Sequence, residues 1–108
     1  MGSSKTEIFN ENQNNLASYA KALGHPARIA ILEYLIRSNA CVCGDIVDEV
    51  GLAQATVSQH LKALKNAGII KGNVEGTSIC YCIDEDNWSK TRTLIDSFFD
   101  TYPNDNCC

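Results

Sequence analysis

The sequence predicts a mainly α-helical winged helix-turn-helix domain with a small β-hairpin wing (α+β), in the order helix, helix, helix, helix, strand, strand, helix. Three observations favour this fold. Apolar residues recur at helical spacing, a short turn separates the two central helices, and two strand-like segments flank a glycine-containing turn. We expect a single, dimeric domain, because 108 residues bury only a modest core and two copies can share their long amphipathic helices.

The helices expected before the hairpin each have a start or a stop signal. The first ends at Gly24, and Pro26 fits the first turn of the second, whose wide apolar face makes it the most buried. Asp45 is placed to cap a brief third helix, whereas Ala53 is a weak capping residue before the fourth. These helices are expected at residues 16–23, from Pro26 onward, at 45–50 and at 54–67.

A hairpin and a final helix complete the predicted fold. Strands at 69–73 and 78–83 flank the turn segment 74–77. The last helix, 85–102, carries an apolar stripe suited to a second chain, formed by Trp88, Leu94, Ile95, Phe98, Phe99 and Tyr102. We therefore expect a flexible lead-in at 1–15, a winged helix-turn-helix domain with dimerisation helices at 16–102, and a cysteine-containing tail at 103–108.

Composition and charge exclude several classes of protein. The net charge of −4 argues against an indiscriminate nucleic-acid binder, although Lys62, Lys65 and Lys71 leave one cationic face. Apolar stretches are too short for a membrane span or a signal segment, so we expect a cytoplasmic protein with no membrane partner. The chain has no Cys-x-x-Cys on a strand–helix unit and no glycine-rich cofactor loop. We therefore expect neither an enzyme, such as a small thiol reductase, nor an organic cofactor.

The fourth predicted helix has a face suited to double-stranded DNA. Short hydroxyl and amide side chains on it are able to reach base edges, and lysines are placed for phosphates. His60 is either a DNA contact or, as we favour, a residue hydrogen-bonded to the core, and His25 is expected to pack or cap. A merely solvated helix face is the alternative for the whole surface. The predicted DNA-binding residues are Gln54, Thr56, Ser58, Gln59, His60, Lys62 and Lys65 on the helix and Lys71 in the wing.

The cysteines indicate soft-ligand chemistry. There are six, and without a signal segment we expect them to be mainly reduced thiols. As(III) and Sb(III) favour three thiolates, whereas Cd(II), Pb(II) or Zn(II) recruit three or four donors. Cys41 and Cys43 are expected in an irregular segment leading into the third helix, where both sulfurs can turn toward one ion. Cys107 or Cys108 of the tail is expected to complete the set of metal ligands.

A second Cys-x-Cys pair, Cys80 and Cys82, lies on the second predicted strand. Both side chains share one face of that strand, with alpha carbons roughly 7 Å apart. Three roles stay open for this pair: packing in the core, a second or shared ligand site, and redox pairing. They are the less favoured metal ligands.

Two stretches resemble the ArsR/SmtB family of metal- and metalloid-responsive winged-helix repressors. Residues 23–32 (LGHPARIAIL) are similar to the family's opening on the second helix, and residues 56–64 (TVSQHLKAL) to its recognition helix. The likeness runs from about Ala17 to Asp100. It implies a homodimer, held mainly by the first and last helices, that binds a palindromic operator and releases it when an inducer binds.

The resemblance also bears on the inducer. Cys41-Val42-Cys43 resembles the cysteine pair of arsenic and of cadmium/lead sensors, but Val47 stands where the arsenic pattern has a third cysteine. The last helix lacks the histidines of the family's zinc or nickel site. We therefore expect an arsenic-sensor-like repressor that leaves DNA on binding As(III) or Sb(III). The alternatives are a Cd-, Pb- or Zn-responsive repressor, a thiol redox or persulfide sensor, and, in a different class, a protein-binding winged-helix module.

Overall fold

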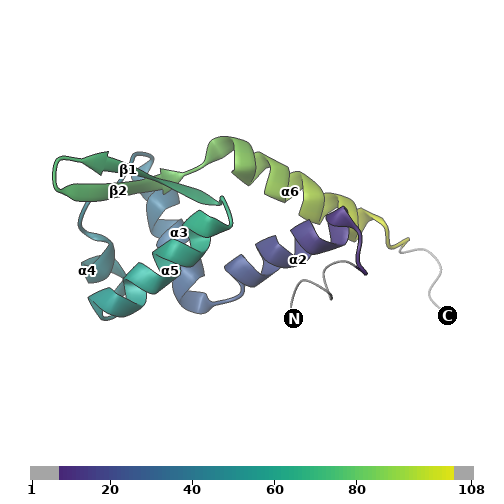
Figure 1. Cartoon of the computed structure of the whole chain (residues 1–108), viewed down its shortest axis with the longest axis horizontal. Coiled ribbons are helices and arrows are strands. Elements are labelled where there is room, and N and C mark those ends of the chain that lie inside the picture. The colour runs from purple at the N-terminus through teal and green to yellow at the C-terminus, as the bar shows by residue number, and fades with distance from the viewer. Residues whose placement is uncertain (1–7, 104–108) are drawn as a thin grey trace.

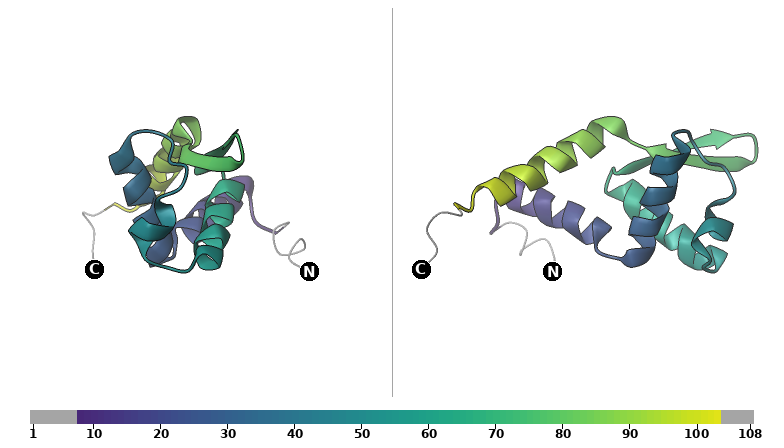
Figure 2. Two further views of the ribbon diagram at one scale, coloured as in Figure 1. Left: turned by 90° about the vertical axis from the view of Figure 1, so that its left-hand side faces the viewer. Right: turned by 180° about the vertical axis from the view of Figure 1, so that it is seen from behind.

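A computed structural model describes residues 8–103 and confirms the predicted winged helix-turn-helix (Figure 1). The helix-turn-helix and the hairpin wing lie at one end of the molecule, and the first and last helices converge at the other (Figures 1 and 2). The elements in chain order are α2 (Glu11–Leu23), α3 (Pro26–Ser38), α4 (Ile46–Val50), α5 (Gln54–Asn66), β1 (Ile70–Glu75), β2 (Ser78–Ile83) and α6 (Glu85–Asp100).

Helix α2 begins before the predicted residue Leu16, inside the segment expected to be a flexible lead-in. A capping box explains the early start: Asn10 Oδ1 accepts from the backbone N–H of Gln13 at 2.8 Å, and Gln13 Oε1 accepts from the N–H of Asn10 at 2.9 Å. These two bonds satisfy backbone donors that would otherwise be unpaired at the helix end. The spacing of Asn10 and Gln13 in this segment was therefore a helix start signal.

The core forms where α3 packs against α4, α5 and β2. Helices α3 and α5 supply fully or nearly fully buried apolar side chains at helical spacing, which confirms the expected inward faces of both. The short helix α4 lacks the expected cap, because Asp45 makes no side-chain hydrogen bond there, and Ala53 likewise leaves the start of α5 without one. The buried residues of α3 and α5 are Ala27, Ile31, Leu32, Leu35, Val57, His60, Leu61 and Leu64.

The wing is an antiparallel pair of strands in which Ile70 faces Ile83 and Glu75 faces Ser78. Strand β1 extends two residues past the predicted end at Asn73, because the turn is tighter than expected. Gly76 allows that turn, since its φ of +64° lies in the left-handed region that glycine adopts without strain. Ile70, at the base of the wing, is buried in the core, whereas residues 74–77 at its tip are exposed.

Helices α2 and α6 pack against each other away from the helix-turn-helix (Figure 2). The far end of α6 leaves large apolar side chains uncovered: Phe98 is 54% exposed and Phe99 is 67% exposed. Such a patch on one face of a helix pair is typical of a surface that meets another protein. Within residues 8–103, the helices are all too short or too polar to pass through a lipid bilayer.

Candidate nucleic-acid interface and cysteine cluster

Helix α5 presents one polar face to solvent and one apolar face to the core. Val57, Leu61 and Leu64 are buried, so the helix is fixed in rotation about its axis. The opposite face carries no carboxylate, and its hydroxyl, amide and ammonium groups are free to meet a nucleic acid. The exposed residues of this face are Gln54, Thr56, Ser58, Gln59, Lys62 and Lys65, and Lys71 of the wing is also exposed.

His60 lies on the inner side of α5 and is only 9% exposed. Its Nδ1 accepts a hydrogen bond from Arg28 Nε at 3.1 Å, and its ring lies 4.4 Å from the ring of His25. His25 in turn caps α3, because its Nδ1 accepts from the N–H of Ala27 at 3.0 Å. The geometry therefore supports the coupling role for His60 over a direct contact with DNA, and it confirms the capping role of His25.

Arg28 connects three helices, a role that sequence reasoning missed. Besides its bond to His60, its guanidinium donates to the carbonyl oxygens of Lys21 and Ala22, both at 3.3 Å, near the end of α2. A cation near a helix C-terminus satisfies carbonyl groups that lack intrahelical partners. The available signal was a single arginine on the otherwise apolar first turns of α3.

The pKa of His60 predicts that acid destabilises the fold. Burial lowers this pKa below its ordinary value of 6.5, and the charges of His25 and Arg28 lower it further. The unfolded chain therefore takes up a proton near pH 6.5 that the folded chain resists, and the free energy of unfolding should fall as the pH drops below that value, by about 1.4 kcal/mol per pH unit at most. Urea unfolding at fixed protein concentration should show a smaller loss of stability for His60→Gln, whose amide oxygen still accepts from Arg28. Equal pH slopes for the two proteins would contradict this assignment.

The four cysteines of the described chain meet at one place. Val42 pairs with Tyr81 on the free edge of β2, and their backbones exchange two hydrogen bonds of 2.8 Å each. The residues on either side of such a pair stand directly opposite each other without hydrogen bonds, with alpha carbons about 4.5 Å apart. This register brings Cys41 to Cys82 and Cys43 to Cys80, at Cα–Cα distances of 4.4 and 3.9 Å, and each pair forms a disulfide.

This arrangement confirms one expectation and corrects another. The segment that holds Cys41 and Cys43 is irregular apart from the single bridge at Val42, but the four sulfur atoms are paired as disulfides rather than present as thiols. Cys80 is also 1% exposed, so bonding and packing coincide there. The missed signal was the equal spacing of the two Cys-x-Cys pairs, because residues on either side of one paired residue can meet the residues on either side of its partner. The expected tail ligands, Cys107 and Cys108, lie outside the described residues.

Two polar side chains of β1 lie beside the cluster. Lys71 stands opposite Cys82 and Asn73 opposite Cys80, so all of them share one face of the hairpin. Asn73 Nδ2 lies 3.8 Å from Cys41 Sγ and donates to it. A cleft of about 420 Å³ opens next to the Cys41–Cys82 disulfide. It is lined in part by Cys41, Cys82, Lys71 and Asn73.

The cysteine cluster and α5 lie against the same core. Val42, between the two cysteines, and Ile46, at the start of α4, are both buried in the same core cluster as Val57 and Leu61 of α5. The cysteine segment and α5 therefore rest on the same packed side chains, and the two disulfides join that segment to the wing. The sulfur cluster and the exposed polar face of α5 belong to one packed unit.

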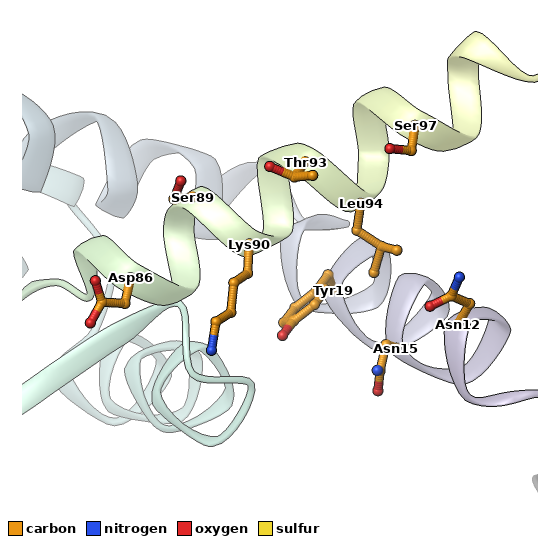
Figure 3. A pocket seen from close by; sticks show the side chains of 9 residues that line it. All are labelled: Asn12, Asn15, Tyr19, Asp86, Ser89, Lys90, Thr93, Leu94 and Ser97. Carbon is orange, nitrogen blue, oxygen red and sulfur yellow. The ribbon is translucent and has the colours of Figure 1, made fainter.

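A larger hollow than the cleft beside the cysteines lies elsewhere, between α2 and α6. It measures about 720 Å³ and is lined mainly by polar residues; Lys90 and Leu94 of α6 extend to the same side of that helix, and Tyr19 of α2 lies between them (Figure 3). A second hollow of about 520 Å³ between the same helices is apolar and is lined by residues such as Leu16, Ile95 and Phe99. Neither contains the cysteines, so both belong to the helix pair and not to the sulfur site.

The chain is similar to known transcriptional regulatory proteins. Residues 25–71 match the model of a family described as bacterial regulatory protein, arsR family. An uncharacterized HTH-type transcriptional regulator of Methanocaldococcus jannaschii is 40% identical over 87 residues, which cover 80% of this chain and 97% of that protein. A cadmium resistance transcriptional regulatory protein of Staphylococcus aureus, a CadC homolog, is 33% identical over 96 residues, which cover 88% of this chain and 76% of that protein.

A solved structure shares the architecture. The homodimeric winged helix-turn-helix DNA-binding domain of a possible ArsR-family transcriptional regulator from Mycobacterium bovis matches with a TM-score of 0.63 and 25% sequence identity. The match covers 87% of this chain and 90% of that one, so the likeness includes the helix pair as well as the helix-turn-helix and wing.

Proposed function

Because this chain belongs to the ArsR/SmtB family of helix-turn-helix regulators, and is a DNA-binding transcriptional repressor rather than an enzyme, we propose that the cysteine cluster controls its hold on DNA. The inducer proposed is a thiophilic species, foremost As(III) or Sb(III). One observation carries the proposal: Cys41 and Cys43, which lead into the helix-turn-helix, lie bonded against Cys80 and Cys82 of the wing. Chemistry at the sulfurs therefore acts on both DNA-facing elements.

The proposed DNA complex is formed by a homodimer on a palindromic operator. Helix α5 enters the major groove with Gln54, Thr56, Ser58 and Gln59 toward base edges, while the lysines of α5 and the wing meet phosphates. The exposed apolar end of α6 supports the dimer, with a second copy of the chain as its occupant, and the related M. bovis domain is homodimeric. A two-fold dimer presents two α5 helices to two half-sites.

Loss of a phosphate contact should appear in the salt dependence of binding. Each lysine that neutralises a phosphate contributes about 0.9 to the slope of log K against log salt concentration. Lys62→Gln and Lys65→Gln should therefore each make the slope shallower by about 0.9 when binding to duplex DNA is measured by fluorescence anisotropy. Lys90→Gln, which removes one positive charge from α6, is the matched control and should keep the wild-type slope. Unchanged slopes in the α5 variants would instead favour a protein-binding winged helix.

The donor set fits a soft inducer once the cluster is reduced. Among residues 8–103 no group of three or more cysteine, histidine or carboxylate side chains stands open to an ion, and the four sulfurs are shared in disulfides. Reduction leaves four thiols facing each other across a strand pair, enough for the three thiolates that As(III) and Sb(III) prefer. The wing pair then supplies the third donor that Cys41 and Cys43 lack, without recourse to the tail. Cd(II), named for the S. aureus relative, is the competing ion.

A titration tests the inducer. A duplex selected from a random pool by binding serves as operator, and reduced protein on it is titrated with arsenite, antimonite, Cd(II) and Zn(II), with anisotropy as the readout. Arsenite or antimonite should release the DNA at the lowest concentration, with a loss of affinity of up to about 150-fold, the upper part of the usual coupling range. Release by Cd(II) or Zn(II) alone would identify a divalent ion, rather than As(III) or Sb(III), as the inducer. No release by any ion would refute the metalloid proposal.

Redox control is a second candidate, favoured by the two disulfides of the structure. If oxidation is the signal, protein oxidised before the titration should bind the operator more weakly than reduced protein, and dithiothreitol should restore binding. Equal affinity of the oxidised and reduced forms would reject this candidate while leaving the metalloid proposal intact.

A further inference from the structure

The two disulfides of the cluster lie in different surroundings. Cys43 is exposed, but its partner Cys80 is only 1% exposed and is shut into the core. Cys41 is also exposed, and its partner Cys82 is half-buried and lines the cleft of about 420 Å³ next to the wing. The Cys43–Cys80 bond therefore has one buried sulfur, whereas both residues of the Cys41–Cys82 bond are accessible to solvent.

This difference decides which bond can exchange with an external thiol. In thiol–disulfide exchange, one sulfur is attacked and the other departs as a thiolate, and a stabilised leaving thiolate departs faster. Attack on Cys43 would expel a thiolate at buried Cys80, where an unpaired charge is costly. Attack on Cys41 expels a thiolate at Cys82, in a cleft open to water and opposite the ammonium of Lys71.

We propose that the Cys41–Cys82 bond is an exchange site for a low-molecular-weight amino-acid or peptide thiol. The incoming thiolate attacks Cys41 Sγ and forms a new S–S bond to it, the Cys41–Cys82 bond breaks, and its electron pair leaves on Cys82 Sγ. One thiolate is consumed and one is produced, so no further oxidant or reductant is needed. Asn73, which donates to Cys41 Sγ at 3.8 Å, orients the attacked sulfur.

The charges around the cleft suit a thiol of this class. Lys71 supplies an ammonium and Glu85 a carboxylate, so the lining is not uniformly cationic. A reactant that carries both a carboxylate and an ammonium meets a partner at each, whereas a polyanion would meet repulsion at Glu85. The Cys43–Cys80 bond stays closed during this exchange and keeps the wing tied to the segment before α4. The inference rests on the proposed thiol control of the repressor and names the position where small thiols act on it.

Peptide mass spectrometry tests the site. Full-length oxidised protein, with both disulfides verified by intact mass, is mixed with reduced glutathione, quenched with acid and alkylated. The glutathione adduct should appear on Cys41, with alkylated Cys82, at least about tenfold faster than any adduct on Cys43 or Cys80. Lys71→Gln should slow the adduct on Cys41 about threefold, the size of a partly exposed charge interaction, whereas the matched control Lys62→Gln on α5 should not. Glutathione adducts on Cys107 and Cys108 are quantified separately, on the peptide that contains the tail.

Three outcomes would overturn the inference: equal rates at both disulfides, an adduct that forms first on Cys82, or identical rates for Lys71→Gln and the wild type. The measurement uses no DNA, so it separates the inference from the proposed function. Selective exchange at Cys41 with no change in operator affinity would leave the exchange site standing and refute redox control. Operator release on oxidation, without selective exchange at Cys41, would refute the exchange site and leave redox control standing.

Discussion

Reduced protein with both Cys41→Ser and Cys43→Ser should bind operator DNA as tightly as the wild type and should keep that affinity when arsenite is added. The wild type should lose affinity by up to about 150-fold under the same conditions. Serine is close to cysteine in size but offers no soft thiolate, so the substitutions remove the ligands and leave the segment around Val42 in place. Anisotropy of a labelled operator fragment, read with and without arsenite, measures both affinities.

Paired variants identify the third donor. Replacement of Cys80 and Cys82 by serine should also abolish the response to arsenite, whereas Cys107→Ser with Cys108→Ser should retain it, because the wing sulfurs already face Cys41 and Cys43. Since Cys80 is buried, the DNA affinity of this double variant before arsenite is added is the control against misfolding. A response that depends on the tail pair would return the third donor to Cys107 or Cys108. A response that survives every pair would refute the assignment of the cluster as the inducer site.

The substitution Phe99→Asp should separate the two copies of the chain. Phe99 is 67% exposed at the end of α6, beside the apolar hollow between α2 and α6. A carboxylate there would be buried in the proposed interface, and a two-fold axis repeats the change on the partner. At about 2 kcal/mol for each copy, the dimer weakens by about 4 kcal/mol, close to 1000-fold. Sedimentation velocity should show a monomer at micromolar concentration, and operator binding should fall with it, because one monomer spans only one half-site.

Ile36→Asp is the matched control for the dimer. Ile36 is 52% exposed on α3 and lines the cleft beside the wing rather than either hollow between α2 and α6, and the substitution makes the same kind of change from apolar to acidic. It should leave the dimer intact. Dissociation by both variants would indicate a general loss of stability, and a dimer that survives Phe99→Asp would place the interface elsewhere.

The sequence alone was enough for features whose signals are local. Val57, Leu61 and Leu64 recur at helical spacing in the sequence and are buried on the inward face of α5, and the polar residues between them are exposed as predicted. Strand β2 was predicted with its observed bounds, Ser78–Ile83. The capping box at Asn10 was also readable, although the polar composition around it hid the helix start. Each of these signals acts within one or two turns of helix, or across one strand.

The disulfide partners and the partner of His60 were decided only by the tertiary structure. Cys41 and Cys82 are separated by 41 positions along the chain, and Arg28 and His60 by 32. No periodicity within either segment sets such a register. It is set by packing, because burial of Val42 in the core places that residue opposite Tyr81 and thereby aligns the cysteines on either side of each. The sequence determined which residues carry sulfur and which polar residues α5 presents to solvent, whereas the tertiary structure decided that the cysteine segment and α5 share one core.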